Sequence, residues 1–165
     1  MICLRPLLLV FVIIILTTAG CIGPEQPGDT QYPMTEMTVS PDSEAESSVL
    51  IRISFDDPEV IAELYDNAAA NDLRSMLPLT LIFRDYNGAE KIAYPPETLD
   101  TENAPKGYDP EAGDVALYAP WGNIAVFYRD SPYASGLVPL GHVVSGLESL
   151  AAVSGEFSAT IDVLE

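Results

Sequence analysis

Cysteine and histidine are scarce in this sequence of 165 residues, and their scarcity excludes several kinds of chemistry. Both cysteines, Cys3 and Cys21, lie near the start, so the remainder has no disulfide framework and no thiol nucleophile. His142 is the single histidine, and no nucleophile-elbow motif accompanies it. One histidine is also too few for a histidine-based zinc site. We therefore expect neither a catalytic triad nor a metal or other cofactor.

Basic residues are also few, with 7 lysines and arginines against 25 acidic residues and a formal net charge of −18. Such a field repels the phosphate backbone of nucleic acids and an anionic membrane surface. We therefore expect no nucleic-acid partner. The acidity is typical of a soluble surface, and recruitment of a cationic ligand stays open as an alternative. The acidic loop, whose carboxylates do not follow calcium-loop spacing, is expected to be solvated; it includes Asp100, Glu102, Asp109, Glu111 and Asp114.

The first 20 residues carry a secretory signal pattern. Arg5 is followed by an uninterrupted apolar run from Leu7 to Leu16 and then by small residues before Cys21. The stretch resembles a lipoprotein signal, which implies cleavage before Cys21 and a diacylglycerol on its thiol. An uncleaved N-terminal anchor is the alternative, because residues 4–22 could nearly span a bilayer. Both interpretations predict a membrane-attached chain whose remainder faces outside the cytoplasm.

Residues 21–47 are predicted to be the lipidated cysteine and a disordered acidic tether. The segment after Cys21 is rich in Pro, Gly, Ser, Thr and acids and contains no Lys or Arg. It has too few apolar residues to repay the entropy of ordering. As a coil of this length it would span on the order of 30 Å.

Residues 48–165 read as one mainly β domain. "SVLIRISF" and "EVIAELY" alternate as a hairpin, Asn67 can cap the helix "AAANDLRSML", and "LTLIF", "EKIAY", "DVALY" and "NIAVFY" read as further strands. "LVPLGHVV" is extended with Pro139 at an edge or bulge, "SGLESLAAV" is a short helix, and "FSATIDV" closes the chain. Roughly eight short strands and two helices are typical of a small closed barrel.

Next to one strand, Glu90 and Lys91 could pair across the barrel as a surface salt bridge.

The corner "APWGN" between two strands is the candidate binding site. Trp121 lies between Pro120 and Gly122, and Asn123 places an amide beside its indole. An apolar wall beside a polar group is typical of a ligand site, although Trp121 could equally pack as a lid over the barrel mouth. The candidate cleft residues are Trp121, Asn123, Tyr118, Tyr94, Phe127 and Tyr133.

Several stretches together resemble the small bacterial and archaeal cyclophilin-like proteins. They are "VIAELYDNAAANDLRSML", "LPLTLIFRDYNGAEKIAYPP", "GDVALYAPWGNIAVFY" and "LGHVVSGLESLAAV". The resemblance covers residues 48–165 and implies a closed eight-stranded β-barrel with two short capping helices.

The catalytic motifs of the prolyl isomerases do not accompany this resemblance. No Phe-His-Arg triplet follows the first helix, no Gln-Gly-Gly-Asp motif occurs, and Leu137 stands where the family has a histidine. Arg84 and Arg129 could supply a guanidinium, but no matched motif places them. We therefore expect a membrane-tethered domain that binds a small molecule or a peptide segment in a barrel-side cleft. The alternatives are a weak peptidyl-prolyl isomerase acting on cell-surface proteins and a purely structural partner in an envelope assembly.

Overall fold

A computed structural model describes residues 49–164 of the chain. The predicted signal segment, the lipidation site Cys21 and the tether lie outside these residues and stay predictions. Within the described part, no helix combines the length and apolar character that crossing a membrane requires.

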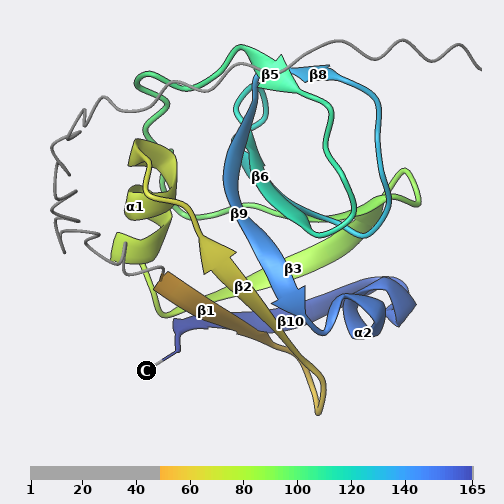
Figure 1. Ribbon diagram of the computed structural model, residues 1–165. Coiled ribbons are helices and arrows are strands. Elements are labelled where there is room, and N and C mark those ends of the chain that lie inside the picture. The colour runs from red at the N-terminus through yellow and green to blue at the C-terminus, as the bar shows by residue number, and fades with distance from the viewer. Residues whose placement is uncertain (1–48, 165) are drawn as a thin grey trace, which may run out of the picture. The chain divides into compact units, whose positions relative to one another are not determined.

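Eight strands close into an antiparallel barrel, which confirms the predicted fold class (Figure 1). Around the barrel each strand pairs with two neighbours in the order β1-β10-β3-β4-β7-β6-β9-β2. The strands are β1 (Val49–Ser54), β2 (Glu59–Leu64), β3 (Leu79–Tyr86), β4 (Glu90–Ala93), β6 (Asp114–Tyr118), β7 (Asn123–Phe127), β9 (Leu137–Ser145) and β10 (Glu156–Val163).

Alternate residues of each strand point into the barrel and form its core. On β1, Ile51 and Ile53 are almost fully buried, and on β3 Phe83 has no exposed surface. Phe83 stacks on Phe157 of β10, which in turn contacts Phe55. This inward set follows the period-two alternation of the sequence.

Two helices cover the barrel, as predicted. The first, α1 (Ala68–Ser75), is capped by Asn67, whose Oδ1 accepts a hydrogen bond from the backbone N–H of Ala70 at 3.0 Å. It buries Leu73 in the core, and α2 (Leu147–Ala152) buries Leu150 in the same core. In Figure 1 the two helices lie on well separated parts of the barrel.

Pro139 lies at a β-bulge on β9. Ala116 of β6 pairs with Pro139 while Val115 pairs with Gly141, so Leu140 is the extra residue. The bulge accommodates the missing N–H of proline within the barrel. The sequence predicted that Pro139 lies either on an edge strand or at a bulge, and the structure shows the bulge.

A second apolar cluster lies on the outer face of the barrel. Ile92 of β4, Ala125 and Phe127 of β7, Ala116 of β6 and Leu137 of β9 are buried there, against Tyr108, Tyr118 and Ala134. Tyr108 and Ala134 belong to a separate two-stranded ribbon, formed by β5 (Gly107–Tyr108) and β8 (Ala134–Ser135). Its strand β5 lies within the predicted acidic loop, and the ribbon covers part of the outer face.

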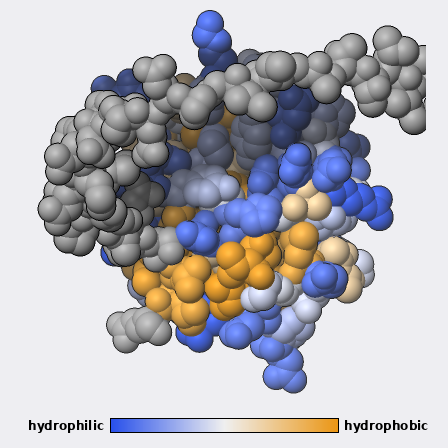
Figure 2. Space-filling view, in the orientation of Figure 1, coloured by the Kyte–Doolittle hydropathy of each residue, from blue (hydrophilic) through white to orange (hydrophobic). Residues whose placement is uncertain are grey.

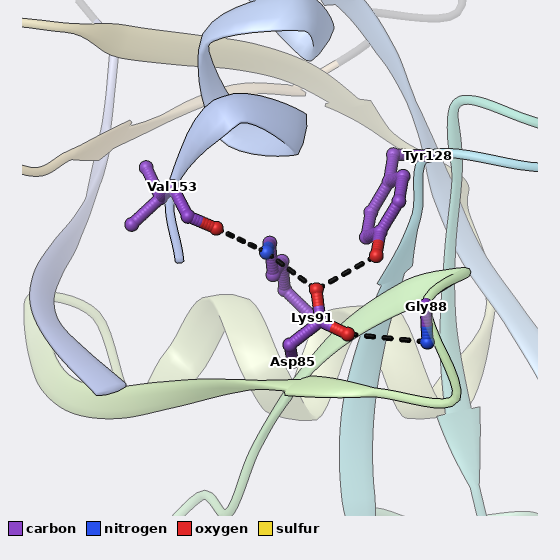
Figure 3. A network of polar contacts seen from close by, with 5 residues as sticks. All are labelled: Asp85, Gly88, Lys91, Tyr128 and Val153. Atoms are coloured by element: carbon purple, nitrogen blue, oxygen red, sulfur yellow. Dashed lines mark hydrogen bonds and ion pairs between the residues drawn. The ribbon is translucent and has the colours of Figure 1, made fainter. Parts of the chain in front are cut away.

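The ion pair expected between Glu90 and Lys91 does not form, because the two residues point to opposite faces of β4. Lys91 points into the barrel, where it has 0% exposure. Its ammonium donates to Asp85 at 2.7 Å and to the carbonyl of Val153 just after α2 (Figure 3). Asp85 also accepts from the hydroxyl of Tyr128 at 2.7 Å and from the backbone N–H of Gly88. The hydrogen bond from Lys91, followed by that from Tyr128, lowers the pKa of Asp85.

Hydrophobic residues also reach the surface elsewhere. Figure 2 shows them gathered over the region where β1, β10 and α2 lie in Figure 1, with hydrophilic residues around them.

Candidate functional site

A cavity of about 330 Å³ lies on the outer face of the barrel, and we call it the barrel-side cavity. Its floor is the outer apolar cluster, represented by Ile92, Phe127 and Leu137. Residues 131–134, which lead into the ribbon, form one wall, and the turn between β6 and β7 forms another. The volume is at the lower end of the range typical of small-molecule sites.

The turn between β6 and β7 positions Trp121. The carbonyl of Tyr118 accepts hydrogen bonds from the backbone N–H groups of Trp121 and Gly122, at 3.1 and 2.9 Å. Gly122 has a φ of 70°, a left-handed conformation that glycine adopts without strain. This explains why the indole stands between a proline and a glycine: the turn holds it at the rim.

Three aromatic side chains meet at this rim. The ring of Trp121 makes edge-to-face contacts with Tyr118, at a centroid distance of 5.3 Å, and with Tyr86, at 5.5 Å. Trp121 is nevertheless 49% exposed. Its indole is therefore held in place by neighbours while much of its surface stays free, as suits contact with a ligand.

Asn123, a residue of the cavity lining, carries a buried acceptor without a partner among the described residues. The residue is 2% exposed, and its Oδ1 has no hydrogen-bond partner among the described residues. Its Nδ2 donates to the carbonyl of Ile124 at 3.3 Å. Because a carbonyl can only accept, this contact fixes which end of the amide is unpaired. A buried oxygen without a donor costs stability unless a bound molecule supplies one.

Glu90 places a carboxyl on the same floor. Its strand neighbours are Tyr86 of β3 and Phe127 of β7, so aromatic rings flank it on both sides. Burial raises the pKa of Glu90 from 4.5 to about 7. No salt bridge joins it to any described residue, and among the described residues that line the cavity it is the single charged side chain.

Five of the six predicted cleft residues line the barrel-side cavity: Trp121, Asn123, Tyr118, Phe127 and Tyr133. Tyr94 does not. It follows the end of β4, is 46% exposed, and lies against the guanidinium of Arg84 at 5.8 Å.

Sequence reasoning missed Glu90 and Tyr86 as members of the site. The register between β3 and β4 brings them together, and a single sequence does not reveal that register. An alternation signal was available, because Glu90 and Ile92 share one face of their strand.

Comparison with known proteins agrees with this architecture. Residues 53–162 match the model of the Cyclophilin-like family. The chain belongs to this family. The cyclophilin-like domain is also similar to the solution structure of a hypothetical protein from Archaeoglobus fulgidus, with a TM-score of 0.57 and 21% identity over 74% of this chain and 99% of that one. That likeness shows the fold alone. No curated protein matches the sequence.

Neither candidate arginine of the cyclophilin-like domain lines the cavity. Arg84 lies against Tyr94, and the guanidinium of Arg129 lies 5.8 Å from the ring of Tyr128. Leu137, which stands where the resemblance places a histidine, is buried in the cavity floor. The lining therefore offers aromatic surface, the carboxyl of Glu90, the amides of Asn87 and Asn123 and the hydroxyl of Ser131, with no guanidinium among its described members.

Proposed function

We propose that this cyclophilin-like domain binds a small molecule or a peptide segment in the barrel-side cavity. The observation that carries the proposal is an open aromatic cavity whose lining includes Asn123, a buried residue with an unpaired Oδ1. Folded proteins rarely leave a buried polar atom unsatisfied without a reason, and ligand recognition supplies one.

A binding role fits the lining better than a catalytic one. Isomerisation of an X–Pro bond must overcome a barrier of about 18–20 kcal/mol, and a positioned cationic donor stabilises the transition state. The described lining holds no such donor, and its one ionisable floor group, Glu90, has the opposite charge.

Titration with short peptides and aromatic fragments tests the proposal, because Trp121 is the only tryptophan and its fluorescence reports directly on the cavity. A compound that shifts this emission should also raise the melting temperature of the full-length chain. Trp121→Ala should abolish the stabilisation, as followed by calorimetry. Tyr94→Ala removes an equally exposed aromatic ring outside the cavity and should leave it unchanged.

Prolyl-isomerase turnover above background would contradict a pure binding role if it disappeared in Arg84→Ala or Arg129→Ala. A protease-coupled assay with a chromogenic prolyl tetrapeptide at high protein concentration measures it.

We further propose that the domain is attached to the outer side of the cell membrane through Cys21. The supporting observation is the apolar run and the small residues before this cysteine. Mass spectrometry of the chain from the membrane fraction should show cleavage before Cys21 and a lipid on its thiol, and the Cys21→Ser variant should lack this lipid. A native chain that keeps residues 1–20 and carries no lipid would instead identify the N-terminal segment as an uncleaved anchor.

A further inference from the structure

The polar atoms on the cavity floor are acceptors. Glu90 contributes a carboxyl, and Asn123 contributes an amide oxygen whose amide nitrogen is already engaged with a backbone carbonyl. A complementary ligand must therefore supply a hydrogen-bond donor to Glu90, and a donor that reaches Asn123 must displace the part of the lining that covers its Oδ1.

The charge of the floor and the aromatic rim favour a cation among those donors. Arg84, which shares the outer face of β3 with Tyr86, lies over Tyr94 and makes no salt bridge to Glu90. Electron-rich faces of Trp and Tyr attract ammonium groups, and Trp121 stands at the rim with Tyr86 and Tyr118 in contact with it. The net charge of −18 adds a long-range attraction for cations.

The strand register sets the distance between the two acceptors. Glu90 pairs with Phe127, which lies four residues beyond Asn123 along β7. Four residues of an extended strand span about 13 Å. Side chains on one face of a sheet stand roughly parallel, so the two acceptors are separated by a similar length. The floor that joins them is apolar and includes Ile92, Phe127 and Leu137.

We infer that the barrel-side cavity recognises a protonated amine with an apolar chain, whose ammonium group pairs with Glu90 and whose second N–H donor reaches Asn123. This inference rests on the proposed binding function and specifies its ligand class. A free aliphatic diamine and a lysine side chain presented by a peptide both carry this chemistry.

Four probes and the full-length chain test the inference through Trp121 fluorescence and calorimetry at pH 8. The compound 1,8-diaminooctane should bind at least about tenfold more tightly than 1,8-octanediol, its neutral isostere, because hydrogen bonds to charged groups are the stronger ones. Acetyl-Gly-Lys-Gly-amide is compared with its norleucine analogue. Preference for the diamine alone identifies a free amine, and preference for the lysine peptide identifies a protein segment.

Two matched variants locate the charge recognition. Glu90→Gln keeps the shape of the side chain and should remove the preference for amines over neutral isosteres. Glu97→Gln removes the same charge from an exposed glutamate outside the cavity and should preserve the preference.

The outcomes separate the inference from the proposed function. Neutral probes that bind as tightly as the amines would overturn the inference and leave a ligand-binding cavity. An amine preference that survives Glu90→Gln would also overturn it. Absence of any response at millimolar concentrations from all four probes overturns the amine inference, whereas a response of the same protein to other fragments would keep the binding function.

Discussion

Replacement of Glu90 by glutamine should stabilise the protein at alkaline pH and leave its stability unchanged in acid. The folded structure raises the pKa of this carboxyl from 4.5 to about 7 through burial. Between these two values the folded state binds more protons than the unfolded state. The free energy of unfolding therefore falls as the pH rises from about 4 to about 8.

The size of the effect follows from the pKa. At about 1.4 kcal/mol per pKa unit, the shift corresponds to a cost of at most about 3.5 kcal/mol for the ionised carboxyl. Glu90 is only partly buried, and solvent around it weakens the penalty. We therefore expect Glu90→Gln to be about 1–2 kcal/mol more stable than the native chain at pH 8 and to differ little at pH 4.

Urea denaturation followed by far-ultraviolet circular dichroism at pH 4, 6 and 8 measures this difference. Glu97→Gln serves as the control, because it removes the same formal charge from an exposed position and reports the effect of net charge alone. A Glu90→Gln variant that matches this control at pH 8, or whose gain is the same at all three pH values, would refute the assignment of Glu90 to a desolvated floor.

Three further substitutions test the barrel around the cavity. Asp85→Asn leaves the buried ammonium of Lys91 without its counter-charge and should lower the free energy of unfolding in urea by about 3 kcal/mol. The double variant Asp85→Asn, Lys91→Met should recover most of this loss. An equal loss of unfolding free energy in the single and the double variant would contradict the pairing. For the native chain, the lowered pKa of Asp85 means that its contribution is present above pH 4 and is lost as the pH falls further. Gly107→Ala, whose new Cβ would collide with the backbone of Ala134, should loosen the β5–β8 ribbon and speed amide hydrogen exchange there, without a matching change in the barrel strands. Asn67→Ala removes the cap of α1 and should lower the unfolding free energy by about 1 kcal/mol, whereas an unchanged midpoint would show that the cap is dispensable.

The alternation of apolar residues was sufficient to predict the strands that build the barrel. Ile51 and Ile53 on β1 follow the period-two pattern and are buried as that pattern requires. The cap at Asn67 was equally local, since its acceptor and the donor of Ala70 lie three residues apart. The alternation and the helix cap both depend on residues close together in the sequence, so they can be predicted from one sequence alone.

The presence of Glu90 in the cavity and the burial of Lys91 were not predictable in the same way. Whether Lys91 lies inside or outside depends on which face of β4 meets the core, and its partner Asp85 reaches it across the β3–β4 pair. Burial of a lysine runs against residue preference and needs the specific partners that tertiary structure assembles. The corner at Trp121 was recognisable because a turn signal and an aromatic residue coincide there, whereas the ribbon over the floor consists of two-residue strands too short for any period.

Closure of the barrel also restricts how a peptide could be recognised. The two strands under the cavity floor, β4 and β7, each have hydrogen-bonded neighbours on both sides, so neither offers a free backbone edge to which a guest strand could add. A peptide in the cavity would instead be distinguished by a few side-chain or terminal groups. Such a surface would accept peptides of varied backbone conformation and would select among them by one or two chemical groups.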